Sequence, residues 1–157
     1  MKQLFLISFV IFASFFAVSA QQMIDLQVNG VKIATPYSVV VQKLGKPSSK
    51  KKGGTFPCDN NGEMLTLRYQ GLVIKLIEAN DGTGYFVGAI NITSAKWSAS
   101  GINIGATVKE VRDRFGNSEL TKKLGLKNLS YGMGEGFADF YFRNGKLVKI
   151  NWEFNIC

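Results

Sequence analysis

The stretch GINIGATVKEVRDRFG at residues 101–116 repeats the pattern of GVKIATPYSVVVQKLG at residues 30–45. The two stretches align without a gap at an offset of 71 positions, with apolar residues in register and a glycine at both ends. Similarity at a fixed offset is the signature of one supersecondary unit used twice. The sequence therefore predicts a single domain, residues 21–157, made of two tandem repeats at about 24–97 and 98–157.

Each repeat predicts one helix near its start, because apolar residues recur there at helical spacing. Thr35-Pro36 is typical of an N-cap followed by proline at the first helical position, and Thr107 with Glu110 forms a capping box. Gly45 and Gly116 stand where a left-handed C-cap would end each helix.

A polar loop is expected after each helix, at residues 46–62 and at 117–127, where the second loop has room for a short helix. Alternation of apolar and polar residues then predicts strands. These strands are expected at residues 64–69, 72–78, 85–93, 138–143 and 147–154, with turns at Gln70-Gly71 and Asn144-Gly145. The predicted fold class is α+β, with both helices packed on one face of an antiparallel sheet.

The alternation also assigns the two faces of the sheet. The expected core face carries Leu65, Leu67, Tyr69, Ala138, Phe140, Phe142, Val148, Ile150, Trp152 and Phe154. The expected open face carries Thr66, Arg68, Asp139, Tyr141, Arg143, Lys149, Asn151 and Glu153. This open face is polar yet contains an aromatic side chain, so Tyr141, Arg143, Lys149 and Arg68 are the predicted partner-binding residues.

The first twenty residues are predicted to be a signal peptide. Lys2 supplies a positive n-region, residues 4–18 form a short apolar h-region, and Ser19-Ala20 offers small residues for cleavage. The protein is therefore expected to be exported, either periplasmic or secreted. The chain carries 19 Lys and Arg against 11 Asp and Glu, which favours an acidic protein or an anionic surface as partner. Export and the lack of an aromatic-basic motif argue against nucleic acid.

The two cysteines, Cys58 and Cys157, are expected to form a disulfide, as pairs in exported chains usually do. The chain contains no histidine, so the commonest metal ligand and the usual general base are missing. We expect no metal, no cofactor and no catalytic residues.

Three local patterns have both a structural and a functional reading. Residues 132–136 are glycine-rich but precede no helix, so they are interpreted as an inter-strand connection and not as a phosphate loop. Asp139 and Glu153 on facing strands could be paired carboxylates, although a solvated sheet surface is favoured. The run Lys50, Lys51 and Lys52 is interpreted as a solvated loop that could steer an acidic partner.

The repeat resembles a known pattern of helix, polar loop and aromatic hairpin. It is similar to the tandem-repeat fold of the β-lactamase inhibitor protein and of the small lipoprotein subunit of the outer-membrane barrel-assembly machine. The matching residues are Gly101, Gly105, Thr107, Val111, Phe115, Gly116, Phe140, Phe142, Asn144, Gly145 and Leu147. The resemblance implies a non-catalytic binder that presents a concave sheet to a protein. The chain lacks the cysteine that would anchor a lipoprotein after cleavage.

The sequence thus favours an exported, non-catalytic protein-binding or inhibitor-like module. Two alternatives stay open. One is a small secreted hydrolase that uses the carboxylates of Asp139 and Glu153. The other is a binder of anionic envelope polymers or lipid through its basic loops.

Overall fold

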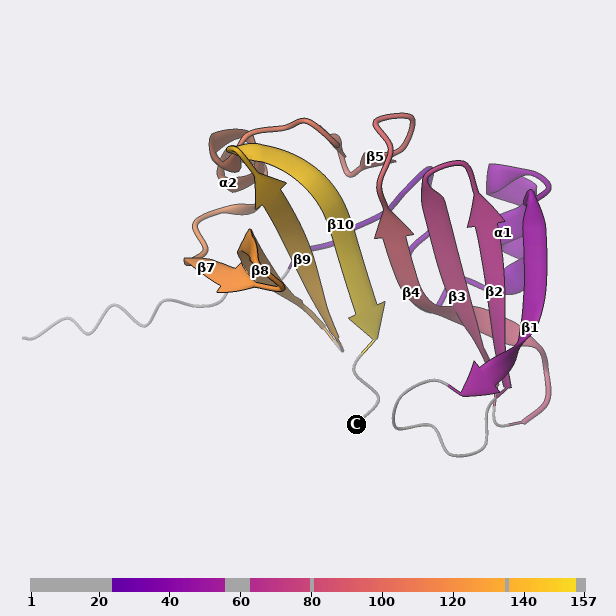
Figure 1. The fold of residues 1–157 in the computed structure, drawn as a ribbon. Helices are drawn as coiled ribbons and strands as arrows, with labels where there is room; N and C mark the ends of the chain where they lie inside the picture. Colours follow the sequence, from indigo (N-terminus) through magenta and orange to yellow (C-terminus); the bar gives the residue numbers. More distant parts are fainter. Residues whose placement is uncertain (1–23, 56–62, 80, 135, 155–157) are drawn as a thin grey trace, which may run out of the picture.

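The computed structural model describes residues 24–55, 63–79, 81–134 and 136–154. In chain order these residues form a helix, four long strands, a small two-stranded ribbon, a second helix and four more strands (Figure 1). The elements are α1 (Tyr37–Leu44), β1 (Ser49–Thr55), β2 (Glu63–Tyr69), β3 (Leu72–Glu78), β4 (Tyr85–Ile92), β5 (Ser98–Ala99), β6 (Ile102–Asn103), α2 (Val108–Phe115), β7 (Leu120–Lys123), β8 (Leu126–Met133), β9 (Gly136–Arg143) and β10 (Lys146–Phe154). The class is α+β, as predicted.

The eight long strands form one antiparallel sheet in the order β1-β2-β3-β4-β10-β9-β8-β7. The two central strands, β4 and β10, pair from Ile92 opposite Ile150 to Ala89 opposite Glu153. Strands β1 and β7 lie at the two outer edges of the sheet. Both edges carry lysines, which blunt the tendency of an exposed edge to pair with another chain.

Glycine forms the C-cap of both helices, as predicted. Gly45 and Gly116 have φ of 77° and 88° and close each helix with a backbone hydrogen bond. The capping box of α2 is present as predicted, because the Thr107 side chain accepts from Glu110 N–H and the Glu110 carboxylate accepts from Thr107 N–H. The expected cap of α1 is wrong by one position. Pro36 is the N-cap itself, and the Thr35 hydroxyl instead accepts from Lys32 N–H.

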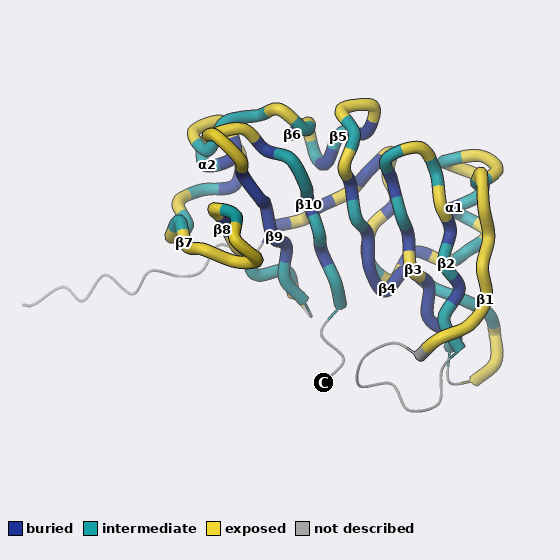
Figure 2. Tube along the Cα trace, viewed as in Figure 1, coloured by how far each residue is buried: buried dark blue, intermediate teal, exposed yellow. Residues whose placement is uncertain are grey.

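The core draws on both helices and both halves of the sheet. Val40 of α1 and Val111 and Phe115 of α2 are buried in the same cluster as the apolar faces of the strands. The Phe115 ring centroid lies 5.4 Å from that of Phe140, and Trp152 is fully buried in the same cluster. Each such side chain contributes roughly 1.5–3 kcal/mol through burial. Figure 2 shows the alternation of buried and exposed positions along the strands.

One predicted face is wrong at the start of β10. Val148 was expected in the core, but Leu147 is buried there at 1% exposure and Val148 is only partly buried. A bulge between Leu147 and Lys149 against β9 shifts the register by one residue. Such a shift exchanges the faces that neighbouring side chains occupy.

Two segments that were expected to be loops are strands. Residues 49–55 form β1, and residues 117–127, expected as a loop or short helix, contain β7 and the start of β8. The lysines hid these strands because edge positions accept charged residues that a central strand would exclude. The glycine-rich residues 132–136 span the β8–β9 connection, as expected, although Gly132, Met133 and Gly136 themselves pair within the strands.

Several predictions fall outside the described residues. The signal peptide at residues 1–20 and both cysteines, Cys58 and Cys157, lie there. Neither described helix is long and apolar enough to span a membrane.

Candidate functional site

The face of the sheet opposite the core is hollowed into a groove of about 410 Å³. Val73 and Lys75 on β3 line the same groove as Lys123 and Leu124 at the tip of the β7–β8 hairpin. Strand order places β4, β10, β9 and β8 between β3 and β7. Since residues so far apart in the sheet line one hollow, this face must be concave. The other lining residues are Ala89, Ile90, Asn91, Tyr141, Lys149, Asn151 and Glu153.

A buried polar cluster lies beneath one end of the groove. The Asp139 side chain on β9 is only 1% exposed, and its Oδ2 accepts from Lys123 Nζ at 2.5 Å and from the Tyr141 hydroxyl at 3.2 Å. Its Oδ1 accepts from Asn128 Nδ2 at 3.3 Å. A buried carboxylate is tolerated when it is paired and hydrogen-bonded, so this cluster ties the β7–β8 hairpin to the floor of the groove.

Tyr141 was expected to face solvent, and that expectation is wrong. Its side chain does lie on the groove face, but it is 3% exposed because Lys149 Nζ lies over its ring at 5.2 Å and its hydroxyl bonds to Asp139. Burial raises the pKa of Tyr141 to about 12, and the negative charge of Asp139 adds to this effect. Tyr141 is therefore a neutral hydrogen-bond donor at every physiological pH.

A ladder of amides crosses the centre of the groove. Asn91 on β4 lies directly opposite Asn151 on β10, and Asn91 Nδ2 donates to Asn151 Oδ1 at 3.2 Å. Asn151 Nδ2 in turn donates to Glu153 Oε1 at 2.8 Å. The groove floor therefore offers fixed amide groups of both polarities, which suits recognition of peptide-like or carboxylate groups.

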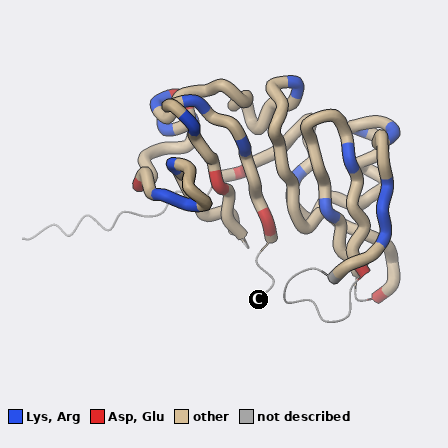
Figure 3. Tube along the Cα trace, in the orientation of Figure 1, with Lys and Arg blue, Asp and Glu red and all other residues tan. Residues whose placement is uncertain are grey.

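The groove keeps a small net positive charge, because Lys75, Lys123 and Lys149 line it against the carboxylates of Glu153 and of buried Asp139. Lys123 is neutralised by Asp139, whereas Lys75 and Lys149 form no ion pair among the described residues. Further basic residues line the outer strands, as Figure 3 shows along β1 and β7. A concave site with uncompensated lysines raises the local concentration of anionic groups.

The structure brings together only part of the predicted binding set. Tyr141 and Lys149 line the groove, whereas Arg68 on β2 and Arg143 at the end of β9 are exposed and do not line it. Arg68 pairs across strands with Val73, a groove residue, so it shares the groove face at its margin. Arg143 shares the face of Tyr141 because it lies two residues along the same strand.

The lysine run at residues 50–52 is not the free loop that was expected. It lies in β1, where successive side chains alternate between faces. Lys50 Nζ donates to the Tyr37 hydroxyl at 3.2 Å and lies over that ring, and Lys52 forms an ion pair with Glu63. Glu63 thereby raises the pKa of Lys52. Lys51 pairs opposite Thr66 on the groove side, so one lysine of the three faces that way.

The two carboxylates of the hydrolase alternative are both engaged. Asp139 is opposite Asn151 in the sheet and is buried with each oxygen accepting a hydrogen bond, so it is not on the solvated surface that was expected. Glu153 accepts from Asn151. A general acid or nucleophile needs an oxygen directed at substrate, and Asp139 offers none. Within the described residues, no three His, Cys, Asp or Glu side chains converge on a metal-sized site.

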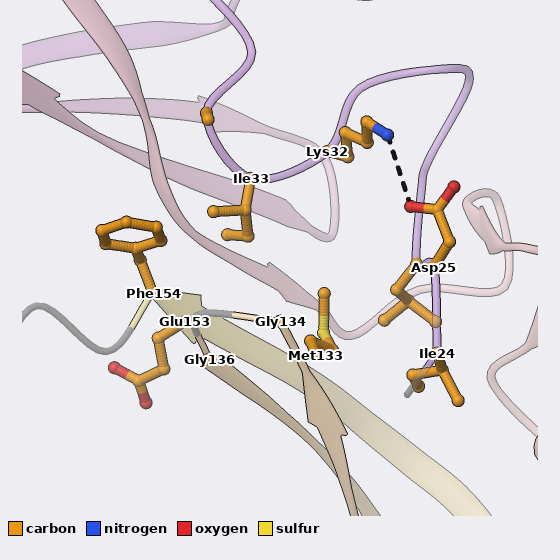
Figure 4. Close-up of a pocket in the computed structure, with 11 residues that line it drawn as sticks. Ile24, Asp25, Lys32, Ile33, Met133, Gly134, Gly136, Glu153 and Phe154 are labelled. Atoms are coloured by element: carbon orange, nitrogen blue, oxygen red, sulfur yellow. Dashed lines mark ion pairs between the residues drawn. The ribbon is translucent and has the colours of Figure 1, made fainter. Parts of the chain in front are cut away.

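A second hollow of about 380 Å³ lies at the C-terminal end of β10, where Glu153 and Phe154 line it (Figure 4). Its wall is mostly apolar, with Ile24, Ile33, Met133 and Phe154 among the lining residues. Three charged residues also line it: Glu153, and Lys32 and Asp25, which pair with each other at 3.5 Å and are largely exposed. Ile24 and Phe154 are the outermost described residues of the chain, so this hollow borders segments outside the described ranges. We therefore assign the candidate function to the groove.

The sequence did not indicate Lys75, Asn91, Lys123 or Leu124 as site residues. Lys75 and Asn91 lie within strands that the alternation pattern found, but their convergence depends on the curvature of the sheet. Lys123 and Leu124 belong to a hairpin whose turn is Leu124-Gly125. A glycine in the second position of a two-residue turn was the one available signal for that hairpin.

Comparison of the sequence with models of protein families gives no match, and comparison with curated proteins gives none either. Solved structures do show the fold. An extracellular protein containing an SCP domain from Bacillus anthracis str. Ames matches 88% of this chain and 50% of its own, with a TM-score of 0.53 and 13% identity. A cysteine-rich secretory protein from Staphylococcus aureus subsp. aureus Mu50 matches 78% of this chain and 44% of its own, with a TM-score of 0.50 and 12% identity.

This chain therefore spans about half the length of those two proteins, and at such low identity the likeness concerns the fold alone. A protein from Streptococcus mutans that is provisionally described as a β-lactamase inhibitor protein matches 80% of this chain and 91% of its own. Its identity is 15% and its TM-score is 0.34, too low to carry an argument. The resemblance to the barrel-assembly subunit stays a prediction.

Proposed function

We propose that this protein is an exported, non-catalytic binding module whose concave groove receives an acidic segment of a partner protein. The observation that carries the proposal is the groove itself, where Lys75 and Lys149 have no ionic partner within the described ranges and lie beside Tyr141 and the Asn91–Asn151 ladder. Carboxylates of a partner would supply the missing charges, and the amides would hold its backbone.

Export is supported by the signal-peptide pattern of residues 1–20. It agrees with the two similar solved structures, one described as extracellular and the other as secretory. We also propose that the scaffold is one unit used twice. The order of the elements supports this, because α1 precedes β1–β4, α2 precedes β7–β10, and the two sets meet at β4 and β10.

A non-catalytic role is favoured over the hydrolase alternative by the engagement of Asp139. Its carboxylate is buried and holds three donors from Lys123, Tyr141 and Asn128. Moving it to act on a substrate would leave Lys123 and Tyr141 without their partner. The arrangement is therefore better suited to stabilising the groove than to chemistry.

The test uses a random peptide library displayed on phage and selected against the immobilised protein. Selected peptides are synthesised, and their affinities are measured by fluorescence anisotropy at physiological ionic strength. Reversal of both free groove charges, Lys75→Glu with Lys149→Glu, should weaken binding at least about tenfold. The matched control is Lys46→Glu with Lys127→Glu, two exposed lysines outside the groove that change the net charge equally.

Enrichment of peptides containing Asp and Glu, with loss of binding only in the groove variant, supports the proposal. Equal loss in both variants would instead indicate non-specific attraction, and the anionic-polymer alternative would then be preferred. Peptides without acidic residues, or unchanged binding by the groove variant, would overturn the proposal.

A further inference from the structure

The tip of the β7–β8 hairpin displays a leucine to solvent. Leu124 is 81% exposed and is the one large hydrophobic side chain so exposed among the described residues. It lines the groove beside Lys123, Tyr141 and Lys149. A single exposed leucine needs no explanation on most surfaces. This leucine lies at the rim of the candidate site, where a partner in the groove would contact it.

The backbone at Leu124 is also in an unfavourable conformation. Its φ is +53°, in the left-handed region, and the following Gly125 has φ of +76°. Three other two-residue turns in the described chain have the same form, with Asn29, Ser100 and Asn144 at φ of 49°, 48° and 50°, each followed by glycine. Asparagine tolerates this region because its short polar side chain bonds locally, whereas leucine does not.

Leu124 therefore carries two costs at one position, an exposed apolar side chain and a strained backbone. Asparagine, which the chain uses in two equivalent turns, would relieve both. Strain that a sequence could relieve by a common substitution and does not is a pointer to function.

The hairpin that presents Leu124 is held in place. Lys123 Nζ donates to the buried carboxylate of Asp139 and lies over the Phe137 ring at 5.1 Å, so the hairpin tip is tied to β9. The tip is therefore an apolar side chain on a fixed support, with Lys123 beside it and Lys149 lining the same groove, which is the arrangement of an interface anchor.

We propose that Leu124 is the hydrophobic anchor of the groove, and that the partner segment presents an apolar side chain flanked by aspartate or glutamate. The inference rests on the proposed function and adds the identity of the contact that determines specificity. A protein segment fits better than a lipid surface, because Leu124 lines a concave hollow whose floor a planar bilayer does not reach.

The test is the substitution Leu124→Asn, which replaces the strained leucine by the residue found in equivalent turns. It should raise the melting temperature by about 2–4 °C, because the backbone strain is relieved. It should also weaken the phage-selected peptides at least about tenfold, because the anchor is lost. Stabilisation combined with loss of binding is a result that a purely structural leucine would not give.

The matched control is Asn144→Leu, which places a leucine in the equivalent turn of the β9–β10 hairpin, outside the groove. It should lower the melting temperature by a similar amount and leave binding unchanged. The selected peptides should also carry an aliphatic or aromatic residue among their acidic ones. Replacing that residue by serine should weaken wild-type binding and leave the residual binding of Leu124→Asn unchanged.

Two results would overturn the inference. In the first, Leu124→Asn binds the peptides as well as wild type while the groove charge-reversal variant does not; the proposed function then survives and the anchor role fails. In the second, wild type binds vesicles of phosphatidylcholine and phosphatidylglycerol, Leu124→Asn does not, and the peptides are unaffected; the leucine is then a lipid contact. If neither the groove charge-reversal variant nor Leu124→Asn loses affinity for the peptides, the proposed function itself is refuted.

Discussion

Lys123→Met should be among the most destabilising substitutions on the groove face. The variant removes the ammonium group that neutralises Asp139, whose side chain is 1% exposed. Breaking a fully buried ion pair from one side costs about 3–5 kcal/mol, because it leaves an uncompensated charge. The Lys123 side chain is itself 45% exposed, and Tyr141 and Asn128 continue to donate to Asp139. We therefore expect a smaller loss, about 2–3 kcal/mol.

The assay is urea denaturation followed by circular dichroism at neutral pH. Thermal denaturation followed by the same signal gives an independent check: for a domain of this size, the expected loss lowers the melting temperature by roughly 5–10 °C. Lys122→Met is the matched control, because Lys122 is the exposed neighbour and forms no ion pair among the described residues. Its effect should stay below about 0.5 kcal/mol.

A double-mutant cycle isolates the pair. When Lys123→Met is combined with Asp139→Asn, no buried charge remains, so the double variant should be more stable than the sum of the single losses predicts. A coupling free energy below about 0.5 kcal/mol, or a Lys123→Met variant as stable as wild type, would refute the view that this pair holds the hairpin.

Three further outcomes are expected. Because burial raises the pKa of Tyr141 to about 12, the contribution of its neutral hydroxyl to stability is complete below pH 10 and is lost as pH rises towards 12; the free energy of unfolding of wild type, from urea titrations, should fall across that window by about 1–2 kcal/mol more than that of Tyr141→Phe, and parallel curves would contradict this. Thr107→Ala removes the capping box of α2 and should cost about 1 kcal/mol in the same assay, whereas no measurable loss would mean that the cap is dispensable. Cys58 and Cys157 should be bonded in the exported protein, as cysteine pairs in exported chains usually are, and because β1 and β10, the strands that precede them, run in the same direction in the sheet; two alkylated cysteines in the mass spectrum of unreduced protein would show otherwise.

Local patterns identified the helices and the long central hairpins from the sequence. The capping box at Thr107 and the glycines at 45 and 116 placed the helix ends, because caps depend on residues a few positions apart. The β2–β3 and β9–β10 hairpins followed from alternation and from turns such as Asn144-Gly145. The edge strands β1 and β7 did not, since their lysines read as loop residues until a neighbouring strand pairs with them.

Local patterns predicted which residues face the groove, but not which of them are buried or paired there. Alternation correctly placed Tyr141 and Lys149 on the face away from the core, but it could not show that Tyr141 is covered by Lys149 or that Asp139 is paired with Lys123. Lys123 lies 16 positions from Asp139, on a hairpin that was not recognised. Burial on the polar face is set by which distant strand curves over it, and no local pattern encodes that.

The sequence alone thus determined the α+β class, the C-terminal ends of both helices and the side of the sheet to which most strand residues belong, because these depend on neighbours along the chain. Tertiary structure alone decided which residues line the concave polar face, that Asp139 is buried in it, and that Leu124 lies at its rim. These features arise from the curvature of eight strands paired in one order, where residues on β3 and on the β7–β8 hairpin line one hollow across the three intervening strands β4, β10 and β9.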